Sequence, residues 1–347
     1  MIGAGRDVRG GVSSVVNSYY DAGLDKLCEL TYLPTMEDGS KLKKLFVATV
    51  ARLRFETLIK KNDILHVHMS SDNSFYRKAV FIRKAHKEGK KIIIHMHGST
   101  FDLFYKERCN DTQKQQVREV FAMADQVIAL SEDWKEFLAE YICDEQKIVV
   151  IYNAVKIPEA YQKDYANRKM LFLGILGQRK GTYDLIEVLP EILRQYPDCH
   201  VYFGGDGERQ QAEQMCREKG ITDRVTFLGW VRGAEKEKFL EECSIYVLPT
   251  YHEGMPMSIL EAMSYGMAVV STYVGGIPHI ITDGENGLLC EAGDKMALKG
   301  KLLRLLDNQS LRGRLGKSAY RIMVRQFDVR EKVKMVYAIY KELFEKR

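Results

Sequence analysis

The sequence predicts an α/β protein built from two doubly wound domains, each with a central parallel sheet. Short apolar runs of strand length alternate with segments of helical length along the chain, which is the pattern of βαβ units. The chain has 347 residues, more than one hydrophobic core usually organises, so two domains are expected. Several apolar runs end in glycine or polar residues, as strands do where such domains bind ligands at the carboxyl ends of a sheet.

The first domain is expected to span residues 1–157. Its opening residues, MIGAGRDVRGGVSSVV, indicate the end of a strand, a glycine-rich turn and the start of a helix. Only Met1 and Ile2 are left of that strand, so we expect the first strand to be truncated. The later strands are expected at 28–32, 64–69, 92–96, 126–130 and 148–152, and the helices near 41–60, 74–88, 112–123 and 133–141.

A polar stretch without apolar periodicity, residues 158–168, is the predicted linker to a second domain over residues 169–328. The alternation resumes there, and the stretch 246–281 adds a strand, a loop, a helix and a further strand. Apolar spacing predicts that the tail of the chain is helical. Strands are expected at 170–174, 200–204 and 225–228, and helices near 181–195, 207–219, 234–242, 294–306, 309–325 and 329–346.

The composition is that of an ordinary globular protein, with 46% hydrophobic and 29% charged residues. No apolar run approaches the length of a membrane-spanning helix, so none is expected. The seven cysteines are scattered, odd in number and without a Cys-x-x-Cys pair. That pattern indicates free thiols in a reducing cytosol rather than a disulfide framework or a zinc site, and a cytoplasmic location is expected.

Positive charge is concentrated in one segment of the first domain. Residues 41–91 contain 14 Lys and Arg against 4 Asp and Glu, a net charge of +10, whereas the whole chain carries +5 and the remainder therefore −5. A negatively charged partner is indicated, either nucleic acid or an anionic membrane surface. No nucleic-acid-binding motif or aromatic stacking pattern accompanies the charge, so nucleic acid is not expected.

Within this segment, residues 41–60 predict a helix that bears apolar and basic side chains together. It could dock on an anionic bilayer such as the inner face of the plasma membrane, or it could pack on its own sheet and leave a solvated basic face. Basic residues between Arg77 and Lys91 favour the membrane contact slightly. The apolar residues at helical spacing are Leu42, Leu45, Phe46, Val50, Leu53 and Leu58.

The stretch 246–281 contains two glutamates, Glu253 in its loop and Glu261 in its helix, with Gly254 and Pro256 between them. Proline suits the first position of a helix because its missing N–H group would be unpaired there. The N–H groups that follow point outward with the positive end of the helix dipole, which makes an anion site. Two carboxylates beside an anion site predict a ligand with phosphates and hydroxyls, such as a nucleotide sugar.

Other predicted strand ends supply further candidates. Gly10 and Gly11 precede a predicted helix and could let a phosphate approach, although a turn that merely requires glycine explains them equally well. After the strand at 170–174, Lys180 can neutralise a diphosphate, with Arg179 as a second donor. Two further strands end in glycine turns, at Gly205 and before Val231. The number of such endings favours ligand binding over simple tight turns.

A metal site is not expected. The sequence has no Asp-x-Asp, Walker A or His-Glu-x-x-His motif, so lysine, arginine and helix N-termini must hold a diphosphate without a metal or other cofactor. Four histidines on two strands, His66, His68, His95 and His97, have no cysteine or carboxylate partner at ligand spacing. His97, which precedes Gly98 at a strand end, is the functional candidate, and the other three are expected to be structural.

These motifs resemble those of the retaining glycosyltransferases of family four, which have the GT-B fold. The stretch HEGMPMSILEAMSYGMAVVST resembles the family's donor-site motif almost position for position. The resemblance implies two Rossmann-like domains facing across a cleft, the first binding the acceptor and the second the donor, with the last helix, residues 329–347, crossing back to the first. Shorter matches extend over nearly the whole chain: GGV, HMHG, ALSE, YNAV, LGILGQRKGTYDL, GGDGE, FLGWV and DGENGLL.

The resemblance also implies roles for the candidate residues. Glu253, His97 and Lys180 would be the catalytic set, with Glu253 on the transferred sugar and Lys180 on the diphosphate. Glu261 would hold the ribose hydroxyls and Val231 would meet the base through its backbone. The remaining residues that bind the donor would be Gly10, Gly11, Arg179, Gly205, Gly254, Met255, Pro256 and Met257.

The implied reaction moves a sugar from a UDP- or GDP-sugar to a hydroxyl of a glycan or lipid-linked acceptor in cell-surface polysaccharide or lipopolysaccharide synthesis. Members of the family retain the anomeric configuration, by a front-face attack in which the leaving phosphate oxygen helps to deprotonate the acceptor. Catalysis would then depend on positioning and on stabilising the leaving diphosphate, which explains why no nucleophile or base stands out.

One departure from the family pattern leaves alternatives open. Ile175 stands where the family often has arginine, so half of the usual cationic clamp is missing and Arg179, Arg6 or Arg9 would have to replace it. This departure is the argument for a non-catalytic partner or scaffold of a true transferase. A nucleotide-sugar epimerase of the same fold is a further alternative, although the spacing of the two glutamates indicates transfer.

Overall fold

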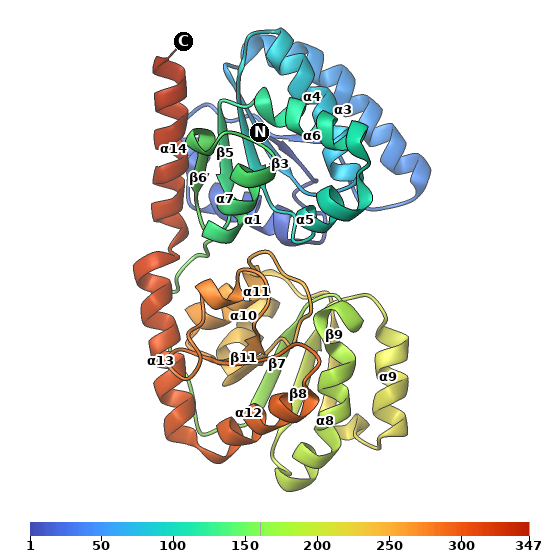
Figure 1. Cartoon of the computed structure of the whole chain (residues 1–347). Coiled ribbons are helices and arrows are strands. Elements are labelled where there is room, and N and C mark those ends of the chain that lie inside the picture. The colour runs from blue at the N-terminus through green and yellow to red at the C-terminus, as the bar shows by residue number, and fades with distance from the viewer. Residues whose placement is uncertain (160, 347) are drawn as a thin grey trace. The chain divides into compact units, whose positions relative to one another are not determined.

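The computed structural model describes residues 1–159 and 161–346, which form two compact units (Figure 1). The first unit contains residues 1–154 together with the helix that begins at Val329, and the second contains residues 155–328. Ala160, in the predicted linker, and Arg347, at the end of the predicted last helix, lie outside the described residues. Each unit has its own sheet and its own core.

The described part of the first unit forms a six-stranded parallel sheet with the order β2-β1-β3-β4-β5-β6. The order reverses between β1 and β3, and ligands of open α/β sheets bind at the carboxyl ends of the strands at such a switch point. The strands are β1 (Ile2–Gly3), β2 (Leu33–Pro34), β3 (Ile64–Met69), β4 (Lys91–Met96), β5 (Gln126–Ala129) and β6 (Ile148–Val150).

The predicted strand at 28–32 is wrong, because the second strand of the chain begins at Leu33. β2 is an edge strand that pairs with β1, through Ile2 opposite Leu33 and Gly3 opposite Pro34. Since β1 has two residues, the ladder that defines β2 also has two. Proline, which has no N–H group to donate, is tolerated on such an edge. A strand and its partner therefore set each other's length, which an apolar run does not reveal.

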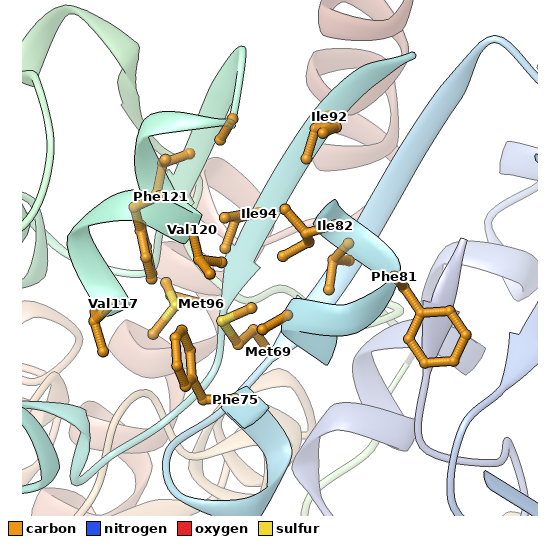
Figure 2. Close-up of a cluster of buried hydrophobic side chains, with 14 of the residues drawn as sticks. Met69, Phe75, Phe81, Ile82, Ile92, Ile94, Met96, Val117, Val120 and Phe121 are labelled. Carbon is orange, nitrogen blue, oxygen red and sulfur yellow. The ribbon is translucent and has the colours of Figure 1, made fainter. Parts of the chain in front are cut away.

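Alternate residues of β4 point to opposite faces of the first sheet, as the period of a strand requires. One face contributes Ile92, Ile94 and Met96 to a hydrophobic core that α4 (Asn73–Lys87) and α6 (Asp111–Ala122) cover. Burying each such side chain contributes about 1.5–3 kcal/mol. Figure 2 labels further members of this core, namely Met69, Phe75, Phe81, Ile82, Val117, Val120 and Phe121.

The opposite face of the first sheet carries the histidines of β3 and β4. Tyr19 of α1 (Gly11–Asp21) packs beside two of these rings. The hydroxyl of Tyr340, from α14 (Val329–Glu345), lies 2.6 Å from His66 Nδ1, and α14 also contacts α1 and β3. The last helix thus packs on the first sheet. The other helical segments of the unit are α2 (Leu24–Leu27), α3 (Lys41–Lys61), α5 (Phe101–Leu103), a π-helical turn (Phe104–Arg108), α7 (Glu132–Tyr141) and a 3-10 turn (Glu145–Lys147).

The second unit also has six parallel strands within its described residues, in the order β12-β11-β10-β7-β8-β9. Its switch point lies between β7 and β10, which are neighbours in the sheet although two other strands separate them in the chain. Both doubly wound sheets predicted from the sequence are confirmed. The strands are β7 (Lys169–Leu173), β8 (His200–Gly204), β9 (Val225–Gly229), β10 (Ile245–Val247), β11 (Ala268–Thr272) and β12 (Leu288–Cys290).

The predicted linker, apart from Ala160, packs onto the second unit. The Lys163 ammonium donates hydrogen bonds to three backbone carbonyls in the segment 240–243. The buried guanidinium of Arg312 donates to the carbonyl of Tyr165 at 2.6 Å. These contacts fix a segment whose polarity alone suggested an exposed connection.

Helices alternate with the strands of the second unit along the chain, and most helices lie within a few residues of their predicted positions. β12 was not predicted, since three apolar residues are too few to produce a period. The helices are α8 (Thr182–Gln195), α9 (Arg209–Glu218), α10 (Gly233–Glu242), α11 (Met257–Ser264), α12 (Lys295–Asp307) and α13 (Gln309–Gln326), with 3-10 turns at Gln178–Lys180, Thr222–Arg224 and Ile277–His279.

Candidate functional site

Two loops at the switch point of the second sheet carry candidate residues. The loop after β7 contains Arg179 and Lys180, and the loop after β10 leads to Glu253. The carbonyl of Arg179 accepts a hydrogen bond from the Thr250 hydroxyl at 3.0 Å and another from the Tyr251 N–H at 2.9 Å. Sheet order brings the loops together, and these bonds hold them in one arrangement.

Lys180 and Glu253 form an ion pair within this site. Their side chains are 13% and 7% exposed, so both charges are largely removed from water. Burial lowers the pKa of Lys180, and the neighbouring carboxylate of Glu253 opposes that change. Such a pair holds its geometry because breaking it would leave an uncompensated buried charge.

The backbone around Glu253 is fixed by two glycines. Gly275 has a φ of +51°, and a Cβ there would lie 1.8 Å from the Glu253 carbonyl oxygen. No other residue fits that approach without moving the loop. The N–H of Gly276 donates to the Gly254 carbonyl at 2.6 Å. These close contacts position the carboxylate of Glu253 and the N–H groups that follow it.

The helix α11 begins at Met257, and Pro256 precedes it as the capping residue. The prediction that Pro256 is the first helical residue is therefore wrong by one position, because its ψ of 114° is extended rather than helical. No side chain in the described chain caps this helix, so its first N–H groups can serve a ligand. The segment from Gly254 to Met257, including Met255, is buried beside Glu253.

Glu261, in the middle of α11, pairs with Lys236 of α10 at 2.7 Å. The two side chains are 19% and 25% exposed. Sequence reasoning identified Glu261 but missed Lys236, which belongs to no motif and meets the glutamate only through the packing of two helices. The ion pair orients the Glu261 carboxylate and leaves its second oxygen available.

The other candidate residues of the second unit lie at the ends of its strands. The N–H of Gly205 donates to the Gly229 carbonyl at 2.7 Å, which ties the end of β8 to that of β9. Val231 is buried just beyond β9. Arg179 is exposed and donates to the His252 carbonyl at 3.3 Å. All of these donor candidates are therefore gathered at one edge of one sheet.

The remaining candidates, Gly10, Gly11 and His97, belong to the first unit. Gly10 precedes α1, and a Cβ on Gly10 or Gly11 would meet no atom within 4 Å, so the turn is open. The Ser13 hydroxyl donates to the Gly5 carbonyl at 2.9 Å and serves the fold. His97 is half-buried at the end of β4, with its Nε2 2.9 Å from His68 Nδ1.

Burial and the neighbouring His95 hold the pKa of His97 well below its usual value. The ring is therefore neutral near pH 7 and can donate or accept a hydrogen bond without carrying charge. Which nitrogen bears the proton depends on the tautomer.

The other three histidines, His66, His68 and His95, lie together in the first unit. One ring nitrogen of each lies within 4.8 Å of the other two, so the rings could hold a metal ion. Burial lowers the pKa of each, which leaves the neutral form that a metal needs. A metal cluster was not expected from these histidines, because no cysteine or carboxylate accompanies them at ligand spacing. The three rings come together because β3 pairs with β4. The expectation of a metal-independent site stays a prediction.

Two family models match the chain. Residues 153–322 match the model described as glycosyl transferases group 1, and residues 20–157 match the model described as glycosyltransferase family 4. Among the described residues, no helix is both long enough and apolar enough to cross a membrane.

Similar curated proteins are glycosyltransferases. An uncharacterised glycosyltransferase of Methanocaldococcus jannaschii is 31% identical over 63% of this chain and 60% of its own length. The N-acetyl-alpha-D-glucosaminyl L-malate synthase of Bacillus anthracis is 24% identical over 80% and 74%. The lipopolysaccharide core biosynthesis glycosyltransferase of Rhizobium meliloti is 31% identical over 46% and 45%. The matches thus span between about half and three quarters of these relatives.

Similar solved structures cover nearly the whole chain. A sucrose-phosphate synthase from Thermosynechococcus elongatus aligns with a TM-score of 0.80 at 19% identity, over 100% of this chain and 98% of that one. The Anabaena protein HepE, in complex with UDP-glucose, aligns with a TM-score of 0.77 at 17% identity, over 98% of each chain. At such identities the likeness concerns the fold, and it confirms the GT-B fold.

Proposed function

Because the chain belongs to the glycosyltransferases of group 1 and family 4, we propose that it moves a sugar from a nucleotide-diphosphate sugar to a hydroxyl acceptor, with retention and without a metal. The observation that carries the proposal is the buried Lys180–Glu253 pair at the switch point of the second sheet. A cation, a carboxylate and the uncapped start of α11 together match a diphosphate joined to a sugar.

Each part of the donor meets a group of suitable chemistry in this scheme. Lys180 and the first N–H groups of α11 stabilise the diphosphate as it leaves, and Glu253 contacts the hydroxyls of the transferred sugar. Glu261 accepts hydrogen bonds from the ribose hydroxyls, while Val231 and Gly205 border the base and the phosphates. In the first unit, His97, neutral at pH 7, and the open turn at Gly10 and Gly11 remain the candidate residues.

Similar proteins support the class of donor and acceptor. HepE was solved with UDP and with UDP-glucose, and relatives include lipopolysaccharide core and amylovoran biosynthesis glycosyltransferases. We therefore expect a UDP-sugar, with a GDP-sugar as the second choice, and an acceptor from surface-polysaccharide or lipopolysaccharide synthesis. A panel of UDP- and GDP-sugars, assayed for release of the nucleoside diphosphate with and without a glycan acceptor, tests this function.

A non-catalytic partner is the competing function, and Ile175 is the observation that favours it. Its side chain is 50% exposed at the position where the family often has arginine, and Arg179 nearby is engaged with a carbonyl. Acceptor-dependent release of the nucleoside diphosphate excludes this alternative. A sugar that is epimerised without release of the nucleotide would instead indicate an epimerase.

We also propose that α3 places the first unit on an anionic membrane surface, the inner face of the plasma membrane. The helix packs through Ala51, Phe55 and Ile59, and of the stripe that the sequence suggested Leu58 packs against the same core. Four large apolar side chains of that stripe stand out instead among exposed lysines and arginines, as a bilayer-docking helix requires. They are Leu42, Leu45, Phe46 and Leu53, which are 80%, 66%, 69% and 68% exposed.

Phe46→Glu is expected to abolish binding to vesicles that contain phosphatidylglycerol. The substitution replaces a large exposed apolar side chain, worth about 1.5–3 kcal/mol on insertion, by a charge that an anionic surface repels. Flotation at low and high salt measures the effect, and neutral vesicles should bind little of any form. Met296→Glu, at a side chain 71% exposed in the second unit, is the matched control and should float like the wild type. Equal flotation of Phe46→Glu would exclude α3 as the docking surface.

A further inference from the structure

The helix α4 buries a lysine among apolar residues. Lys78 is 2% exposed, on the same stripe as Phe75, Ala79 and Ile82, which all belong to the core of the first unit. Packing alone would favour a hydrophobic side chain at this position. Lysine is almost never fully buried unless it is paired, so a partner for the Lys78 ammonium is expected.

In the described part of the chain, no carboxylate forms an ion pair with Lys78. Its ammonium donates one hydrogen bond, to the Ser74 hydroxyl at 2.7 Å, although an ammonium has three N–H donors. Arg77 adds a second positive charge close by, and its Nε is itself buried without a hydrogen-bond partner. Burial and repulsion from Arg77 lower the pKa of Lys78 to about 7. Two adjacent cations without an anion lower the stability of the fold, and a bound anion would restore that stability.

The ammonium of Lys78 lies at the N-terminus of α4, because Ser74 belongs to the first turn of that helix. No side chain in the described chain caps this end, and the Asp72 carboxylate pairs with Arg108 at 3.1 Å instead. The N–H of Ser74 donates to the Ser71 carbonyl at 3.1 Å, and the remaining N–H groups of the first turn and the positive end of the helix dipole add to the charge of Lys78. The helix starts directly after the carboxyl end of β3, at the switch point of the first sheet.

The same edge of the sheet carries His97. The charge of Lys78 is among the causes that lower the pKa of His97. The hydroxyls of Ser71 and Thr100, on the loops after β3 and β4, lie 3.4 Å apart. An anion held by Lys78 would thus lie at the same edge of the sheet as the histidine that we assign to the reaction.

We propose that Ser74, Arg77, Lys78 and the start of α4 form a phosphate site that binds a phosphate ester or diphosphate on the acceptor. The oxygens of such a group can accept hydrogen bonds from the ammonium, the hydroxyl and the helix N–H groups at once. The inference rests on the proposed function, since it assigns this anion to the acceptor and leaves the donor diphosphate to Lys180. A prenyl diphosphate that carries a glycan and a soluble sugar phosphate both offer this chemistry.

Calorimetric titration of the full chain with inorganic pyrophosphate, and in a separate arm with farnesyl diphosphate, tests the site. Saturating UDP is present in both arms so that the donor site is filled. Lys78→Met should weaken both ligands by roughly tenfold or more, the loss expected for a charge-assisted contact, and should leave the UDP affinity unchanged. Lys87→Met, at an exposed lysine of the same helix, is the matched control and should bind like the wild type.

The two arms separate the sources of the phosphate. Tighter binding of farnesyl diphosphate than of pyrophosphate identifies a lipid-linked acceptor, and equal binding identifies the phosphate group alone. Lys78→Met replaces an uncompensated buried charge by an apolar side chain of similar length, so it should unfold at the wild-type temperature or above. A loss of binding in that variant then reflects the missing ammonium at the phosphate site and not unfolding of the protein.

The pH dependence has a defined sign. Raising the pH from 7 to 9 removes the proton of free Lys78, whose pKa is about 7, and so weakens anion binding. Pyrophosphate gains negative charge over the same range and would by itself bind more tightly. The wild type should therefore lose affinity relative to Lys78→Met as the pH rises.

Unchanged pyrophosphate and farnesyl diphosphate binding by Lys78→Met overturns the proposal. A parallel loss of UDP affinity also overturns it, because Lys78 would then serve the donor. Failure of the wild type to bind UDP is a separate result, which contradicts the proposed function, while the pyrophosphate and farnesyl diphosphate titrations still report on the phosphate site because UDP that does not bind leaves them unaffected.

Discussion

Lys180→Met is expected to reduce sugar transfer by about a thousandfold or more. The ammonium is assigned to the leaving diphosphate, where removal of one preorganised donor costs about 10²–10³ in rate and removal of a full charge costs more. The variant also leaves Glu253 buried without its cation, which should lower the free energy of unfolding by about 3–5 kcal/mol. Turnover of the nucleotide sugar and chemical denaturation measure the two effects.

A double variant separates these roles of Lys180. Lys180→Met combined with Glu253→Leu replaces the buried pair by apolar side chains and should recover most of the lost stability, as apolar replacements of buried pairs do. It should recover none of the transfer. Lys334→Met is the control, because it breaks an ion pair with Glu331 whose side chains are 67% and 65% exposed, and it should cost less than about 1 kcal/mol. Transfer by the double variant at the wild-type rate would show that the pair is structural.

Glu261→Gln is expected to weaken UDP binding by roughly 10- to 150-fold, the equivalent of about 1.5–3 kcal/mol for hydrogen bonds to a charged group. The carboxylate is assigned to the ribose hydroxyls, which are present before and after transfer. The Michaelis constant for the donor should therefore rise with little change in kcat. Steady-state kinetics with varied donor measure both quantities.

The control for Glu261→Gln is Glu235→Gln, at an exposed glutamate in the first turn of α10. It removes the same charge from the neighbouring helix and should leave the Michaelis constant unchanged. A Glu261→Gln enzyme with wild-type donor affinity would remove Glu261 from the binding site. A variant with a lower kcat and an unchanged Michaelis constant would move it to the chemical step.

Sequence patterns predicted the longer elements of the fold well. The strand at 64–69 and the helix at 41–60 are present almost as predicted, because their apolar residues repeat over several periods. β2 and β12 were misplaced or missed because two or three residues have no period, and their pairing partners set their length. The buried residues of α3, Ala51, Phe55 and Ile59, lie outside the apolar stripe read from the sequence, since the apolar side chains of this helix point in more than one direction.

The candidate site was predicted as separate residues and not as an arrangement. Lys180 and Glu253 were each identified from local motifs, but their ion pair depends on β7 lying beside β10, which the chain order does not reveal. Lys236 gave no sequence signal, because it meets Glu261 through helix packing. Lys78 could have been found, since it is a lysine on the apolar stripe of a predicted helix.

The central claim is that the second unit binds a nucleoside diphosphate between the start of α11 and Lys180. Calorimetric titration of UDP and GDP into the full chain without added metal tests it most directly. We expect that one of the two binds one to one with a dissociation constant between about 1 μM and 1 mM, and that Lys180→Met weakens this binding at least tenfold. A folded wild-type protein that binds neither nucleotide at millimolar concentration would contradict the claim.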